Sequence, residues 1–335
     1  MPPSNSFYVV GGRLRSTLFR KLEEWRSCEQ ALLIELDPAS NRSTPRIEYV
    51  SPREVCPKNS SAVQFKSATL NGNLLYACTS TEVLVYELPA FRLLHHVSLP
   101  CFNDLHHVYP SQNGTVLVVV TGLDMVVEIT TAGEVVHEWS VIGEDPWVRF
   151  SRKTDYRLVP TTKPHRSHPN HVFELHGEVW VTRFQQRDAI CLTTPGLRID
   201  IAVQSPHDGY VVGDKIYFTT VDAQIVIANK QSLQVEATID LNKMSGPSGQ
   251  ILGWCRGLLP LDDRWLWVGF TRVRPTKFVE NVAWIRNGVS KHKPSHIALY
   301  DLKLGKCEKE IELEPHGIGV VFSLLPVPGT PDLSK

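Results

Sequence analysis

Four histidines and two cationic residues occupy equivalent places in six apolar, β-rich stretches of the chain. The six residues are Lys66, His107, His171, His207, Arg256 and His316. Only 13 of the 335 residues are histidines, so four at one repeated position indicate a shared purpose. Neutral imidazoles that converge suit a transition metal, because each offers a borderline-soft nitrogen and adds no negative charge.

We therefore predict one metal ion with His107, His171, His207 and His316 as ligands, at roughly 2.0 to 2.2 Å. Three histidines with an open position would suffice for a catalytic metal, and Fe(II) is preferred over Cu, Mn or Zn. The turns in the second and fifth blades are one residue longer than their counterparts, so His106 is an alternative to His107. The competing interpretation is a polar channel whose side chains satisfy one another.

The two cationic members of the set predict an anionic substrate. Arg256 suits bidentate binding of a carboxylate, phosphate or sulfate, and Lys66 adds a second charge. His316 then completes the metal site or acts as an acid or base beside both cations. The alternative for each cation is a salt bridge to Asp104 or Asp208, carboxylates that are also close enough in sequence to orient ligand imidazoles.

A repeat of about 40 residues positions these side chains. The pattern of apolar strand, polar turn, second strand, turn and third strand recurs in 65–88, 106–130, 170–193 and 206–229. A fifth copy begins at 255–274 and resumes at 295–313 after an insertion. The sequence thus predicts an all-β protein, a six-bladed β-propeller in which the six residues encircle the axis at one face.

The sixth blade must be assembled from both ends of the chain. Residues 316–327 form its inner strand, and "SFYVVGGRL", "ALLIELDP" and "RIEYVSP" supply the others. Sharing one blade between the termini closes the ring without unpaired strand edges. Residues 1–335 are therefore expected to form a single domain.

Three long insertions, 13–30, 144–167 and 271–294, map to the face that carries the histidines. Long ordered loops are usually functional, so we expect these to act as a lid. An oligomer contact is the alternative. The residues expected to contact substrate at this face are Arg183, Asp208, Trp254 and Arg272, together with Thr219 and Thr220.

Composition excludes several classes of protein. Lysine plus arginine and aspartate plus glutamate both number 35, which disfavours nucleic acid and anionic membranes as partners. No run of apolar residues is long enough to span a membrane, and the start lacks a secretory leader pattern. Seven scattered cysteines without a close pair predict free thiols in a reducing, cytoplasmic compartment.

The segment "LHHVYPSQNGTVLVVVTGLDMVVEITTAGEVVHEW" resembles blades of arylsulfotransferase-type, PQQ-like and NHL-like propellers. This resemblance implies a propeller fold and leaves the activity open. An all-histidine iron centre on a propeller axis also resembles the site design of the carotenoid-cleaving oxygenases.

Three functions follow as hypotheses. The first is a metal-dependent enzyme acting on a small organic anion, an oxygenase or a lyase or isomerase. The second is an arylsulfotransferase-like enzyme without a metal, in which a ring histidine is the nucleophile. The third is a noncatalytic interaction module.

Overall fold

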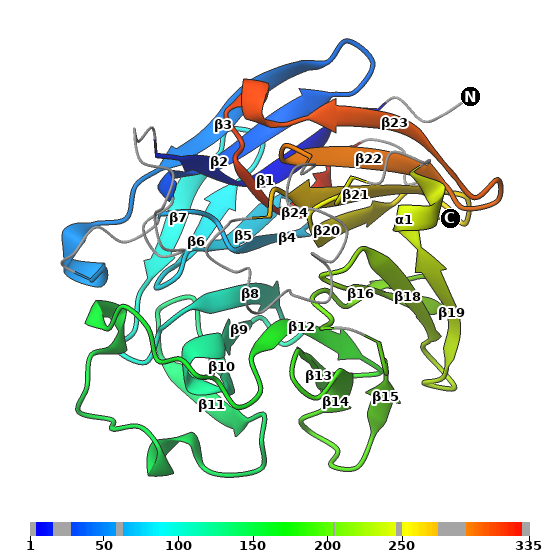
Figure 1. Cartoon of the computed structure of the whole chain (residues 1–335). Coiled ribbons are helices and arrows are strands. Elements are labelled where there is room, and N and C mark those ends of the chain that lie inside the picture. The colour runs from blue at the N-terminus through cyan, green and yellow to red at the C-terminus, as the bar shows by residue number, and fades with distance from the viewer. Residues whose placement is uncertain are drawn as a thin grey trace.

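The computed structural model describes residues 5–15, 28–57, 63–203, 205–245, 250–273 and 293–329. In these residues the chain forms six four-stranded antiparallel sheets, arranged as the blades of a propeller (Figure 1). The helices within the described ranges are short, and α1 (Leu241–Met244) is the α-helix among them. The all-β, six-bladed prediction is confirmed.

In each blade the strand named first below lies at the axis, and the other three strands follow outward in the order in which they are named. Three of them consist of β4 (Ser67–Asn71), β5 (Leu74–Cys78), β6 (Val83–Glu87) and β7 (Arg92–Val97); β8 (Leu105–Pro110), β9 (Val116–Val120), β10 (Met125–Ile129) and β11 (Val135–Ser140); and β12 (Pro169–Leu175), β13 (Glu178–Arg183), β14 (Asp188–Cys191) and β15 (Arg198–Asp200). Two more consist of β16 (Tyr210–Val212), β17 (Lys215–Thr219), β18 (Gln224–Asn229) and β19 (Val235–Asp240); and β20 (Trp254–Pro260), β21 (Trp265–Thr271), β22 (His296–Asp301) and β23 (Lys306–Glu312).

The closing blade joins the two ends of the chain. Its order is β24 (Val320–Pro326), β1 (Phe7–Leu14), β2 (Cys28–Asp37) and β3 (Arg42–Tyr49). The pairing of β24 with β1 runs from Phe7 opposite Pro326 to Gly12 opposite Val320. Gly11 is required there, because a Cβ on it would lie 1.8 Å from the carbonyl oxygen of Val320. The expected pairing of 316–327 with the N-terminal strand is confirmed.

Apolar side chains fill the space between neighbouring blades. Phe173 and Trp180 of one blade pack with Phe218 of the next, and all three are almost fully buried. Burying such rings supplies the main favourable free energy of folding. The inner strands are thereby held close around the axis, which brings side chains from all six blades together.

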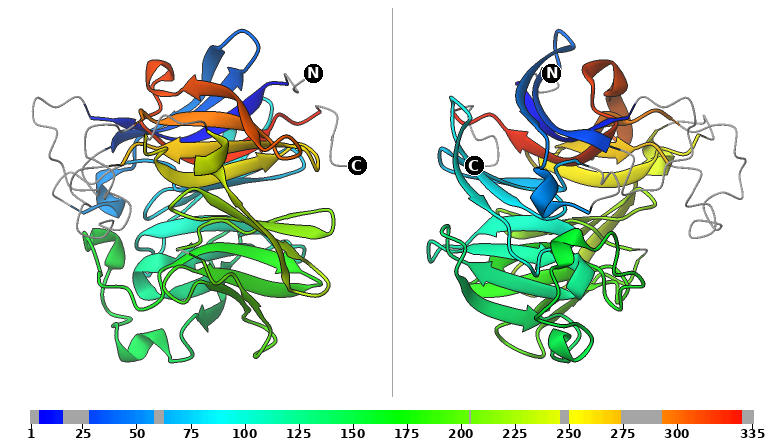
Figure 2. Two further views of the ribbon diagram at one scale, coloured as in Figure 1. Left: turned by 45° about the vertical axis from the view of Figure 1, so that its right-hand side comes forward. Right: turned by 90° about the vertical axis from the view of Figure 1, so that its left-hand side faces the viewer.

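Short 3₁₀ helices lie in the connections between strands. They are η2 (Arg53–Val55), η3 (Thr121–Leu123), η4 (Pro146–Val148), η5 (Tyr156–Leu158) and η7 (Glu314–His316). The connection between β3 and β4 and the insertion 144–167 meet at one face, where η2 and η5 lie side by side (Figure 2).

No disulfide joins any of the seven cysteines, all of which lie in described residues. In the part of the chain that the structure describes, no helix is long and apolar enough to cross a membrane.

Candidate functional site

A small cavity of about 20 Å³ lies on the propeller axis. All six blades contribute to its wall. The lining residues are Lys66, Ser67, His106, His107, Asn170, His171, His207, Asp208, Arg256, Phe322 and Ser323. Five of the six residues predicted to form the ring, Lys66, His107, His171, His207 and Arg256, are therefore brought together.

His316 does not line this cavity, so the structure does not bring it together with the other five residues. Its Nδ1 lies 2.8 Å from Oγ of Ser43, and its Nε2 lies 3.2 Å from Oδ1 of Asn41. The inner strand of the closing blade begins at Val320, four residues after η7. Phe322 and Ser323 therefore occupy the places at the axis.

His107 uses both ring nitrogens within the fold. Its Nδ1 accepts the Val172 N–H at 3.4 Å, so its proton sits on Nε2, which faces Oγ1 of Thr69 at 3.4 Å. The Thr69 hydroxyl in turn donates to the Val108 carbonyl oxygen. The ring stacks on that of His171 with centroids 3.5 Å apart. Burial lowers the pKa of His107 to about 3.

A metal ligand needs a free lone pair, which His107 does not offer. Across the described ranges, no group of three or more histidine, cysteine, aspartate or glutamate side chains is arranged to hold a metal ion. The four-histidine metal centre is thus not assembled as predicted. Metal dependence itself stays a prediction, which elemental analysis of untagged protein would test.

His106, the alternative at this position, has a different environment. Its Nδ1 donates to the backbone carbonyl oxygen of Asp104 at 2.8 Å. Since a carbonyl can only accept, the neutral ring carries its proton on Nδ1 and an open lone pair on Nε2. Burial lowers the pKa of His106 to about 3; Asp104 opposes this shift, and Lys66 and Arg256 add to it. His106 is therefore a neutral base next to two positive charges.

The insertion adds two histidines that the repeat alignment did not select. The His168 ring meets that of His106 edge to face, with centroids 4.9 Å apart, and its Nδ1 lies 2.8 Å from Nδ1 of His165. Nε2 of His165 lies 3.3 Å from Oγ1 of Thr162, whose own proton goes to the Gly122 carbonyl. Because the Thr162 hydroxyl donates elsewhere, Nε2 of His165 donates to it, and Nδ1 of His165 accepts from Nδ1 of His168. The lone pair of His168 is therefore on Nε2. The density of histidines in "KPHRSHPNH" is the only sequence signal for this pair.

Asp124 fixes the backbone of this segment. Its Oδ1 accepts the N–H groups of Ser167 and His168 at 3.0 and 2.9 Å. Its Oδ2 accepts from the N–H of Arg166 and from Nη1 of Arg149, both at 2.8 Å. The carboxylate is almost fully buried, and its two oxygens accept hydrogen bonds from all four donors.

We expect Asp124→Asn to lower the free energy of unfolding by about 2 to 3 kcal/mol, because one amide oxygen cannot accept what two carboxylate oxygens do. Asparagine tolerates the left-handed backbone at this position, where φ is 51°, so the change isolates the hydrogen bonds. Hydrogen exchange should accelerate in residues 161–168. Asp145→Asn in the same insertion, which keeps an oxygen acceptor for the single hydrogen bond from the Trp147 N–H, is the control. Equal exchange in both variants would contradict the anchoring role.

The two cations face one aromatic ring. Nζ of Lys66 lies 5.5 Å and the guanidinium carbon of Arg256 5.0 Å from the centroid of Phe322. Both side chains are buried. Lys66 also forms the expected salt bridge to Asp104, at 3.2 Å. Trp254 lies against Arg256, with 5.1 Å between the guanidinium carbon and the ring centroid.

The remaining predicted substrate contacts divide into two groups. Asp208 lines the cavity, and its Oδ2 accepts from Oγ1 of Thr219 at 2.6 Å and from the Gly257 N–H at 3.0 Å. Burial nevertheless raises its pKa to about 6. Arg183 instead binds Asp188 through two nitrogens, and Arg272 pairs with Glu314. Neither arginine lines the axial cavity. Arg183 ends β13, the second strand of its blade, and Arg272 directly follows β21, the second strand of another blade.

The insertion 144–167 is described in full and contributes His165 beside the ring. Most of the insertions 13–30 and 271–294 lies outside the described residues. Thr220, also expected near the substrate, donates to Asp222 in its own turn.

Comparison with solved structures gives the fold alone. A protein of unknown function from Bacteroides caccae superposes with a TM-score of 0.64 at 14% identity, over 97% of this chain and 100% of that one. A virginiamycin B lyase from Staphylococcus aureus matches with a TM-score of 0.46 at 14% identity, over 75% and 70%. A chain of a mitotic checkpoint complex matches with 0.48 at 8% identity, over 84% and 72%. No family model and no curated protein sequence matches; the chain shares the architecture of propeller proteins.

Proposed function

We propose that the protein is an enzyme, a lyase or isomerase, that binds a small organic anion at the axis and removes a proton from it with Nε2 of His106. The observation that supports this most directly is the proton position on His106. Its Nδ1 is committed to the Asp104 carbonyl, so the basic lone pair is held on the other nitrogen. The ring lines the same cavity as both cations.

A bound anion would reduce the repulsion between the positive charges of Lys66 and Arg256. Lys66 and Arg256 share the Phe322 ring, and like charges in a buried site repel each other. Asp104 forms an ion pair with Lys66, at 3.2 Å. A carboxylate, phosphate or sulfate between the cations would lower this repulsion and accept charge-assisted hydrogen bonds from both.

The same anion would make His106 a stronger base. In the free protein the two cations contribute to its lowered pKa, although burial contributes most. A negative charge placed between them opposes that contribution, so the pKa of His106 rises when substrate is bound. Base strength is thereby linked to occupation of the site.

Asp208 offers an acid on the other side of the cavity. Its Oδ2 is held by Thr219 and Gly257, and its raised pKa favours the protonated form more than is usual for aspartate. A carboxyl group of this kind can return a proton to the substrate after His106 has taken one.

We expect Arg256→Ala to weaken binding of a small anion by about tenfold to a hundredfold, the value of a charge-assisted hydrogen bond. Calorimetry with a panel of carboxylates, phosphates and sulfates measures this. Arg152→Ala is the matched control, because Arg152 is an exposed arginine that pairs with Glu138 outside the cavity. Equal affinities in wild type and Arg256→Ala, or no binding by any anion, would contradict the proposal.

The competing functions predict different results in the same experiments. A sulfuryl or phosphoryl donor that leaves its group on a ring histidine would favour group transfer, and peptide mass spectrometry detects the adduct. Anion binding without turnover of any bound compound would favour a noncatalytic module.

A further inference from the structure

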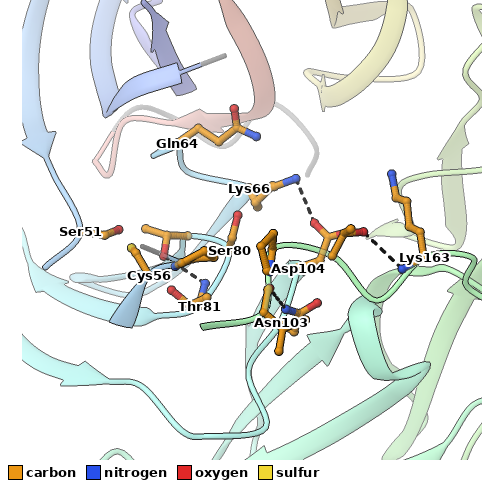
Figure 3. A pocket seen from close by; sticks show the side chains of 14 residues that line it. Ser51, Cys56, Gln64, Lys66, Ser80, Thr81, Asn103, Asp104 and Lys163 are labelled. Carbon is orange, nitrogen blue, oxygen red and sulfur yellow. Dashed lines mark hydrogen bonds and ion pairs between the residues drawn. The ribbon is translucent and has the colours of Figure 1, made fainter. Parts of the chain in front are cut away.

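A second, larger cavity opens beside the axial one. It has a volume of about 70 Å³, room for a fragment of several non-hydrogen atoms. Its wall joins the start of the blade β4–β7 to the insertion 144–167, from Cys56 and Pro57 across to Val159 and Pro160 (Figure 3). We call it the side cavity.

Lys66 connects the two cavities. Its side chain lines both, and its Nζ lies between Asp104 of the side cavity and Phe322 of the axial one. Lys66 thus gives an anion at the axis a neighbour that also lines the side cavity, which is the arrangement that a ligand spanning both cavities requires.

Polar groups of the side cavity lack partners in the described part of the protein. Gln64 is 1% exposed, and its Oε1 accepts no hydrogen bond there. The hydroxyls of Ser51 and Ser80 also form no side-chain hydrogen bond with a described residue. These three side chains lie around the opening in Figure 3. Leaving a buried acceptor unpaired costs free energy, so a ligand that donates a hydrogen bond to it is favoured over one that cannot.

Two other polar side chains of the wall are already satisfied. Thr79 donates to Glu82, and the amide nitrogen of Asn103 donates to the carbonyls of Tyr156 and Val159. The ionised lining residues are Lys66, Lys163 and Asp104, so the wall carries a net charge of about +1. Hydroxyl-bearing anions fit this combination better than apolar chains or cations do.

We infer that the substrate is a hydroxylated carboxylate whose anionic group lies at Lys66 and Arg256 and whose hydroxyl-bearing tail occupies the side cavity. This inference rests on the proposed function, because it requires the anion at the axis. Gln64 selects the tail by accepting a hydroxyl proton, and Ser51 and Ser80 supply further hydrogen bonds. Such a site discriminates strongly against an analogue that lacks the hydroxyl groups.

The affinities of three carboxylates, measured by calorimetry, distinguish binding at the axial cavity from binding in the side cavity. Glycolate is short enough to report on the axial site alone. D-Gluconate and hexanoate have the same charge and six carbons each, and only gluconate carries hydroxyls. We expect wild type to bind gluconate at least tenfold more tightly than hexanoate.

Gln64→Leu, which keeps the side-chain volume, should weaken gluconate about tenfold and leave glycolate unchanged. Gln231→Leu in an exposed turn is the control. Should Gln64→Leu fail to fold by circular dichroism, Ser80→Ala in the same wall gives the same comparison.

The outcomes distinguish this inference from the proposed function. Binding of glycolate with equal affinities for gluconate and hexanoate would overturn the side-cavity inference and leave the axial site standing. A loss of glycolate binding in Gln64→Leu would overturn the division into two cavities. No binding of glycolate or gluconate to wild type would overturn both.

Discussion

His106→Gln should reduce the turnover number about 10² to 10⁴-fold while the anion still binds, since general-base catalysis by a positioned side chain contributes that much. The variant keeps a hydrogen-bonding side chain of similar length beside the Asp104 carbonyl but has no basic lone pair. Affinity should change little, because Lys66 and Arg256 hold the anion. The measurement is kcat and KM on a compound found by the anion screen.

His137→Gln provides the matched control, because His137 is exposed on β11 and packs against Trp139 away from the axis. Its rate should equal that of wild type. Full activity of His106→Gln would remove His106 from the reaction. A rise in KM at constant kcat would instead make it a binding residue.

Mild acid should destabilise the protein steeply, because several neutral histidines are buried together. Burial lowers the pKa of His106 and His107 to about 3 and also lowers those of His168 and His171. The unfolded chain binds protons at these positions near pH 6.5, whereas the folded protein does not. Stability contributed by the neutral form is therefore complete above pH 6.5 and declines as the pH falls toward 3.

At pH 5 the loss should be about 2 kcal/mol for each histidine that stays neutral in the folded state. Denaturant unfolding at pH 7 and pH 5 measures the difference. His107→Gln should reduce this pH dependence by about the contribution of one histidine, whatever its effect at pH 7. His137→Gln should leave it unchanged. A free energy of unfolding that is equal at both pH values would show that the buried rings take up protons in the native protein.

The six blades could be predicted from the sequence because each blade repeats the same alternation of apolar and polar residues at a fixed spacing. Residues that follow this repeat, such as His107, His171 and Arg256, were therefore placed at the axis correctly. His316 was misplaced because a 3₁₀ turn separates it from the strand it was expected to begin. An alignment of residues by their position in the repeat cannot detect such a turn.

The rest of the site depends on contacts between distant segments, which carry no periodic signal. His165 lies in the insertion 144–167, and His168 directly follows it. The carboxylate of Asp124, between β9 and β10, holds the backbone of His168 so that its ring contacts His106. The hydrogen-bond tautomers of His106 and His107 depend on which carbonyl or N–H each ring meets. Adjacent histidines of identical type thus have different chemistry.

The closing blade sets the order in which the protein can be completed during synthesis. β1 is made before the other strands of the propeller, and its inner edge receives its partner only when β24 has been made. Until then the growing chain is an open arc with an exposed strand edge at one end, which invites pairing with another chain. The axial cavity is likewise incomplete, because Phe322, the ring that both cations face, arrives with the last strand. Ligand binding is therefore a property that a nascent chain acquires only once β24 has been made.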